Sequence, residues 1–149
     1  MRFGFTMIEL IFVIVILGIL AAVAIPKLSA TRDDALNVSL ANNIMSGASE
    51  VAAYAMSNAQ TLPQLSSMSN GINAMVQSGQ ATEPTMRTVN IARGAVSDCV
   101  ILKIDVGNLD ENLTLSLGSA GDDRDCLGLQ ALIDTKVYPM VLRGKQVVE

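Results

Sequence analysis

An apolar run near the N-terminus divides this chain of 149 residues into two unlike parts. From Leu10 to Ile25, sixteen successive residues carry no charged or polar side chain. A helix over Phe5 to Ile25 would be about 31 Å long, which matches the hydrocarbon core of a bilayer. The pattern therefore predicts a hydrophobic transmembrane helix over residues 5–26, followed by a part with the polar composition of a protein in water.

The helical pattern continues beyond this run. Apolar residues recur at helical spacing, which predicts an amphipathic continuation over residues 27–58 that packs on a globular head at residues 59–149. Gly18 has weak helix propensity and Pro26 removes an intrahelical hydrogen bond, so we expect a kink at these positions. The expected apolar face consists of Leu28, Leu36, Leu40, Ile44, Val51 and Ala55.

The segment from Leu62 to Ala81 contains Pro63, Gly71 and several serines, and we expect it to connect the helix to a sheet. It should hold one short helix. Four apolar residues at helical spacing predict packing rather than a binding surface: Met68, Ile72, Met75 and Val76.

Strand signals begin near Thr88. Residues 99–106 and 113–117 alternate between apolar and polar side chains, and residues 107–112 have turn composition, so we expect an antiparallel hairpin. Residues 136–142 are a third candidate strand, which Pro139 assigns to an edge. One long helix against a small antiparallel sheet is an α+β fold. The apolar strand positions are Val100, Leu102, Ile104, Val106, Leu113, Leu115 and Leu117.

Charge and residue types exclude several classes of function. The formal net charge is −4 and the ten Lys and Arg residues form no basic stripe, so no direct nucleic acid partner is predicted. The chain has no histidine, which removes the commonest general base and excludes Ser–His and Cys–His nucleophile pairs. No carboxylate or lysine constellation replaces them. We therefore predict no enzyme and no cofactor.

Cys99 and Cys126 are the two cysteines of the chain. Behind an export-like segment, such a pair predicts a disulfide, which would stabilise the fold by roughly 3–4 kcal/mol. Two buried reduced thiols in a cytosolic protein are the alternative.

The residues before Cys126 are unusually acidic. Asp122, Asp123 and Asp125 place three carboxylates within four positions, which is a weak candidate for calcium. The spacing is not that of an EF-hand, and Arg124 lies inside the cluster. A solvated acidic turn is the favoured interpretation, and no metal is assigned.

The front segment has several interpretations. A secretory signal peptide fits Arg2, the apolar core and the small residues at 22–24, but Glu9 lies where that core should begin. A plain membrane anchor tolerates Glu9, because a dozen apolar residues offset the roughly 2.5–3.5 kcal/mol that a central carboxylate costs. It leaves Glu9 without a function. Thr6 and Glu9 also fit a capping box that starts the helix.

A further interpretation includes Gly4 as well. The run Gly4-Phe5-Thr6-Met7-Ile8-Glu9-Leu10, with its apolar continuation and Pro26, resembles the class III leader and N-terminal helix of type IV pilins and type II secretion pseudopilins. The resemblance covers roughly residues 2–30. It implies that a prepilin peptidase removes residues 1–4 by cutting after Gly4 on the cytoplasmic side, and methylates Phe5. It also implies that the backbone between Gly18 and Pro26 can unwind in a filament, with a simple kink as the alternative.

The resemblance gives Glu9 a partner. Cutting after Gly4 creates an ammonium group on Phe5, and a carboxylate in apolar surroundings is tolerable when it is paired with a cation. Glu9 would meet the amine of Phe5 on a neighbouring copy during assembly and set the register between helices. The implied partners are further copies of this chain, other pilins or pseudopilins, the prepilin peptidase, an inner-membrane assembly platform and, before assembly, membrane lipid.

The sequence therefore predicts a structural subunit of a bacterial type IV pilus-like filament, held in the inner membrane before it enters a periplasmic or cell-surface filament. A pseudopilin of a type II secretion or DNA-uptake system is one alternative. A monomeric membrane-anchored or secreted binding domain is an alternative of a different class. In the pilins that the chain resembles, a C-terminal disulfide encloses a surface loop, so residues 107–125 are expected to face outward.

The position of the mature N-terminus is the first testable prediction. N-terminal sequencing and intact mass of the membrane-extracted protein should give a chain that begins at methylated Phe5. A chain that begins at Ile25, or one that keeps Met1, would instead support the secreted or anchored binding domain.

Overall fold

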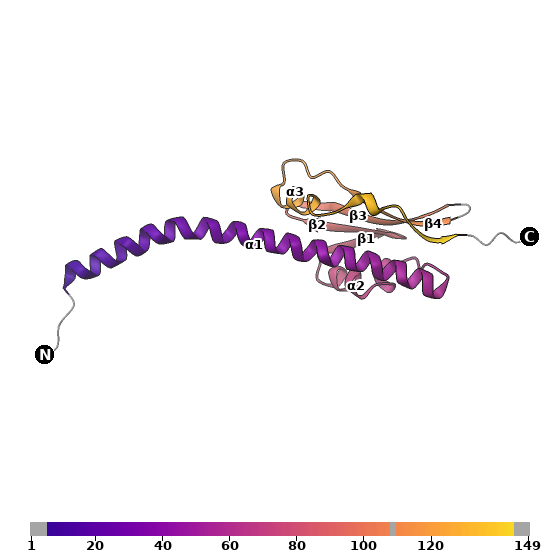
Figure 1. The fold of residues 1–149 in the computed structure, drawn as a ribbon, viewed down its shortest axis with the longest axis horizontal. Helices are drawn as coiled ribbons and strands as arrows, with labels where there is room; N and C mark the ends of the chain where they lie inside the picture. The colour runs from indigo at the N-terminus through magenta and orange to yellow at the C-terminus, as the bar shows by residue number, and fades with distance from the viewer. Residues whose placement is uncertain (1–5, 108–109, 145–149) are drawn as a thin grey trace, which may run out of the picture. The chain divides into compact units, whose positions relative to one another are not determined.

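A computed structural model of the chain describes residues 6–107 and 110–144. Contacts within the chain form two compact units, Met1–Leu36 and Asn37–Glu149, and each is described by itself. The elements, labelled in Figure 1 where there is room, are α1 (Met7–Asn58), η1 (Leu65–Ser67), α2 (Asn70–Gln77), β1 (Ala81–Thr85), β2 (Thr88–Arg93), β3 (Val96–Val106), β4 (Asp110–Leu117), α3 (Arg124–Gln130), η2 (Thr135–Val137) and β5 (Met140–Gly144).

The first unit is formed by the N-terminal part of α1. All residues from Thr6 to Ile25 are exposed in the single chain. By length and composition, Met7–Ile25 is able to cross a membrane. The helix continues through Gly18 and Pro26 without a break, so a kink or local unwinding at these positions stays a prediction.

The second unit begins where α1 starts to pack against other elements. The expected apolar face is buried at Leu40, Ile44, Val51 and Ala55, and α1 ends at Asn58 as the pattern indicated. The prediction is wrong for two other members of that face, Leu28 and Leu36, whose side chains are 67% and 45% exposed. Both precede the second unit, which supplies the core that buries the others.

The sheet is an antiparallel meander in the order β1-β2-β3-β4-β5 (Figure 1). Every strand pairs with its neighbour in the sequence. Short turns join the strands from β1 to β4, whereas residues 118–139, which include α3 and η2, connect β4 to β5. Opposed apolar residues such as Val89 and Leu102, or Ile104 and Leu113, are buried in one core cluster with the packed part of α1. The α+β class predicted from the sequence is confirmed.

The short helix expected between Leu62 and Ala81 is α2, which follows η1. Met68, Ile72 and Met75 are buried, as the pattern predicted, and Val76 packs against the same core. Gly47 of α1 allows α2 to approach closely, because a Cβ atom there would lie 2.8 Å from Cγ1 of Ile72.

The hairpin prediction holds for the strands and is wrong for the turn. Asp110, Glu111 and Asn112 belong to β4 rather than to a turn, and Gly107 N donates to Asp110 O over 2.8 Å to close a shorter connection. Part of that connection, residues 108–109, lies outside the described residues. Val106 and Leu117 were expected in the core but are 50% and 44% exposed, because each is the last residue of its strand.

The two edge strands differ from the prediction. No pattern indicated β1, since Ala81 is its one buried residue and Glu83 and Pro84 are unfavourable in strands. The third candidate strand was placed too early: η2 occupies Thr135–Val137, and β5 begins at Met140, after Pro139 rather than around it. Its position at an edge of the sheet is confirmed.

The disulfide between Cys99 and Cys126 is present and fastens α3 to β3, with 5.7 Å between the two Cα atoms. Both cysteines are completely buried. The solvated acidic turn expected next to Cys126 is present at Gly121 and Asp122, which are exposed, but the prediction is wrong from Asp123 onward, because Asp123 caps α3, which begins at Arg124.

The expectation that residues 107–125 face outward is wrong for β4, where Glu111, Leu113 and Leu115 are buried. The alternation of β4 carries these side chains into the core that α1 covers.

Removal of the disulfide should destabilise the second unit strongly. The bond links residues 27 positions apart, so the double variant Cys99→Ala/Cys126→Ala should lose roughly 3–4 kcal/mol of unfolding free energy. Urea denaturation of the detergent-solubilised chain measures this loss. A reductant should shift the wild type by a similar amount and leave the variant unchanged. A loss under about 1 kcal/mol would contradict the expected constraint on the unfolded chain.

Candidate functional site

The start of α1 is a capping box built from Thr6 and Glu9. The backbone N–H and the hydroxyl of Thr6 both donate to Glu9 Oε2, over 2.9 and 2.7 Å. In return, Glu9 N donates to Thr6 Oγ1 over 3.4 Å. The local pairing that the sequence suggested is therefore present in the single chain. Gly4 and Phe5, the expected processing residues, lie outside the described residues.

The capping box leaves Glu9 able to accept a second partner. Both bonds from Thr6 end on Oε2. Within the described residues, Oε1 has no bonded donor, and the side chain is exposed. A cation that approached Glu9 from outside the chain could bind Oε1 without displacing Thr6.

The helix around Glu9 offers a continuous apolar surface. Between Met7 and Ile25, Glu9 is the one charged residue. So much exposed apolar area requires a covering of lipid or of other apolar helices. The large apolar side chains that are exposed here are Met7, Ile8, Leu10, Ile11, Phe12, Val13, Ile14, Val15, Ile16, Leu17, Ile19, Leu20, Val23 and Ile25.

The acidic residues near Cys126 serve the fold of the second unit. Asp123 accepts from Ala95 N and from Cys126 N, each over 2.9 Å, and these bonds lower the pKa of its carboxyl group. Asp125 lies 3.9 Å from the guanidinium of Arg93, whereas Asp122 is exposed. Among the residues that the structure describes, no group of three or more His, Cys, Asp or Glu is placed to hold a metal ion.

A polar cluster around the buried Glu111 ties the residues after α1 to the sheet. Glu111 of β4 is 7% exposed and accepts from Thr61 Oγ1 over 2.9 Å. The guanidinium of Arg143 on β5 lies 3.3 Å from Glu111 and also donates to Ala59 O over 2.8 Å. The sequence suggested an exposed turn at Glu111, so its pairing with Arg143, 32 positions away, could not be anticipated.

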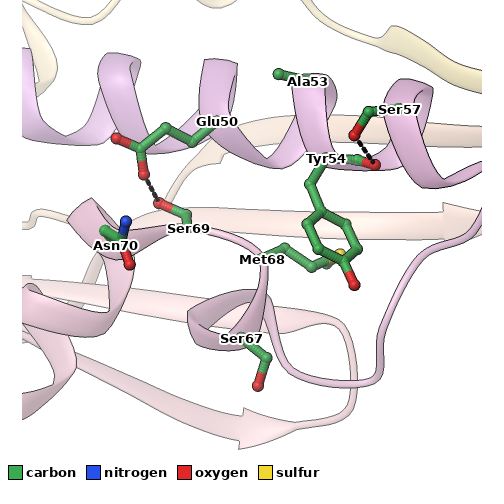
Figure 2. Close-up of a pocket in the computed structure, with 8 residues that line it drawn as sticks. All are labelled: Glu50, Ala53, Tyr54, Ser57, Ser67, Met68, Ser69 and Asn70. Atoms are coloured by element: carbon green, nitrogen blue, oxygen red, sulfur yellow. Dashed lines mark hydrogen bonds between the residues drawn. The ribbon is translucent and has the colours of Figure 1, made fainter.

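A groove of about 490 Å³ opens on the second unit between α1, η1 and α2 (Figure 2). Glu50 lies at one side, where its Oε2 accepts from Ser69 Oγ over 2.6 Å and from Gly71 N over 3.1 Å. These bonds, led by that from Ser69, lower the pKa of the Glu50 carboxyl group. The lining residues are Glu50, Ala53, Tyr54, Ser57, Ser67, Met68, Ser69 and Asn70.

Sequence reasoning missed this groove for a physical reason. Its residues come from two segments, 50–57 and 67–70, which the packing of α2 on Gly47 brings together. The one local signal was Ser69, which caps α2 by accepting from Ile72 N over 3.0 Å. Nothing in the order of residues indicated that Glu50 would meet this cap.

The pairing of Glu50 with the start of α2 should make stability depend on pH. Because folding lowers the pKa of Glu50, its contribution is complete above the unfolded value of 4.5 and is lost as the pH falls through the lower folded value. Glu50→Gln should therefore reduce the unfolding free energy by about 1 kcal/mol at neutral pH, after allowance for solvent screening.

Urea denaturation at pH 7 and pH 3 measures this difference. The matched control is Asp122→Asn, which removes the same charge from an exposed residue that has no hydrogen bond or ion pair among the described residues. If Glu50→Gln lowered the unfolding free energy by the same amount at both pH values, the stabilising role of the charged Glu50 carboxylate would be contradicted.

Comparison with known proteins gives a match at the N-terminus of the chain. The protein-family profile described as "Prokaryotic N-terminal methylation motif" matches residues 1–25. No curated protein and no solved structure matches the chain. The matched residues include Gly4, Phe5 and Glu9, on which the resemblance to pilins was based. The chain thus carries the methylation motif of type IV pilins and pseudopilins at its N-terminus, ahead of a pilin-like α+β fold.

Proposed function

We propose that this protein is the structural subunit of a bacterial type IV pilus-like filament. The observation that carries the proposal is the continuity of two features. The methylation motif on residues 1–25 contains the beginning of an apolar helix, and that helix runs without a break into a folded unit. A signal that was simply discarded would not need to be joined to the body in this way.

In the proposal, the chain is first held in the inner membrane by Met7–Ile25, with the second unit outside the cytoplasm. A prepilin peptidase cuts after Gly4 and methylates Phe5. An assembly platform then transfers the subunit into a filament, where apolar helices of other copies replace lipid around α1. The subunit catalyses no reaction.

Glu9 provides the polar contact between copies. Among the residues that the structure describes, Thr6 is the one that donates hydrogen bonds to its carboxylate. When apolar helices surround it, a carboxylate needs a cation as well, since a buried unpaired charge is strongly unfavourable. The new ammonium group of Phe5 on an adjacent copy supplies that cation, and Oε1 of Glu9 is available to accept its hydrogen bond. The pair fixes the register between helices, as isolated polar groups do in other apolar interfaces.

The same motif supports a pseudopilin of a type II secretion or DNA-uptake system, in which the helix would work in the same way. A monomeric anchored binding domain would need Met7–Ile25 only as an anchor and would give Glu9 no role beyond its capping box.

Two substitutions separate these roles of Glu9. Glu9→Leu removes both the capping bond and the proposed partner of Phe5. Leaving the ammonium group unpaired costs about 3–5 kcal/mol, so polymer should fall by roughly 10²–10⁴-fold. Thr6→Ala, the matched control, removes the hydroxyl and its two bonds with Glu9, but keeps the carboxylate and its bond from the backbone N–H of residue 6. It should cost only about 0.5–2 kcal/mol in helix stability and preserve most of the polymer. Electron microscopy and immunoblots of sheared filaments measure the yield.

Membrane insertion and cleavage must be measured in the same cells, so that a loss of polymer reports on assembly alone. If Glu9→Leu is inserted, cleaved and polymerised like the wild type, the proposed contact is wrong. If both variants lose polymer equally, the capping box is the sole function of Glu9.

A further inference from the structure

The groove lined by α1, η1 and α2 contains polar groups that the fold does not use. Three side chains there make no side-chain hydrogen bond to another described residue: the Tyr54 hydroxyl, the Ser67 hydroxyl and the Asn70 carboxamide. They come from three elements and line one hollow, as Figure 2 shows. Because none of them stabilises the chain through a side-chain bond, they are free to bind a ligand.

The groove also presents an aromatic surface. Tyr54 projects from α1 towards η1, beside Met68, and its side chain is only partly buried (Figure 2). The hollow of about 490 Å³ falls within the range of small-molecule sites. A partly exposed ring with hydroxyl and amide groups around it suits a ligand that has both C–H faces and hydroxyl groups.

The charge of the groove narrows the class of ligand. None of the eight lining residues is Lys or Arg, which disfavours an anion. Glu50 is the one charged residue, and its negative charge is already stabilised by Ser69, by Gly71 N and by the N-terminal end of α2. The demand for an external cation is therefore small. The oxygen of Glu50 that does not bind Ser69 remains an acceptor for a hydroxyl group.

We propose that this groove binds a neutral pyranose sugar, either free or as the terminal unit of a glycan. The sugar hydroxyls bind Asn70, Ser67, the Tyr54 hydroxyl and the Glu50 carboxylate, and a C–H face of the ring packs on Tyr54. This site lies wholly within Asn37–Glu149 and does not depend on filament assembly. Since the groove is open, we expect dissociation constants on the order of 1–10 mM.

Ligand-observed saturation-transfer NMR tests this proposal on the full chain in detergent micelles. The probes are the methyl glycosides of glucose, galactose and mannose, together with N-acetylglucosamine and maltotriose. At least one should bind saturably. Binding of a monosaccharide shows that a single pyranose ring suffices, whereas binding of maltotriose alone shows that the ring binds only as part of a glycan. Inorganic phosphate and methylammonium serve as the anionic and cationic comparisons, and neither should bind at the groove.

Variants locate the site. Tyr54→Phe and Asn70→Ala each remove one ligand-binding group without breaking a side-chain bond of the fold, and each should raise the dissociation constant about three- to tenfold. Asn73→Ala is the matched control: it lies on the same helix, α2, but outside the lining residues, so affinity should be unchanged.

Urea denaturation of each variant verifies that it is folded. The proposal is overturned if no sugar binds, if the sugar binds Tyr54→Phe and Asn70→Ala as well as it binds the wild type, or if methylammonium binds in place of the sugars.

Discussion

The packing of α1 on the sheet between Leu40 and Ala55 is the contact on which the second unit depends. This part of the helix is built largely from small residues, with Ala41, Ala48 and Ala52 buried between larger ones. These small side chains share one core with larger, branched residues of β2, β3 and β4, which fill the space between helix and sheet. Gly47 has no side chain, and this lets α2 pack on another part of the helix surface.

Polar contacts fix the elements around this core. Arg93 Nε donates to the buried Asn37 Oδ1 over 2.5 Å near the start of the packed helix, and Gly128 of α3 leaves room for the Asn37 amide. At the other end, Thr61, Glu111 and Arg143 join the residues after α1 to β4 and β5. Asn37 and Glu111, which are both buried, are thereby paired, as the cost of burial requires. Within the described residues, Arg87 Nε is the buried side-chain atom that has no hydrogen-bond partner. At the start of α1, Thr6 and Glu9 are hydrogen-bonded to each other as well, although both are exposed in the single chain.

How far the sequence predicted the fold depended on how local each cause was. The period of α1, the alternation of β3 and β4, and the packing residues of α2 are local patterns, and the structure has them. Errors arose where a distant partner decided the outcome. Glu111 lies in a segment with turn composition, residues 107–112, but belongs to a strand, because Thr61 and Arg143 bind its carboxylate. Asp123 belongs to a helix start, because its carboxylate also binds Ala95 N on the β2–β3 turn.

The candidate sites also divide into those that the sequence predicted and one that only the tertiary structure formed. The sequence by itself determined the leader motif, the apolar helix and the Thr6–Glu9 pair, since these depend on residues within a few positions of one another. It also indicated the pairing of Cys99 with Cys126, because the chain has no other cysteine. Only the tertiary structure decided the groove beside Tyr54, because residues 50–57 meet residues 67–70 through the docking of α2 on α1. Such docking depends on whether side chains from distant parts of the chain fit together in volume, and a short run of residues does not determine this.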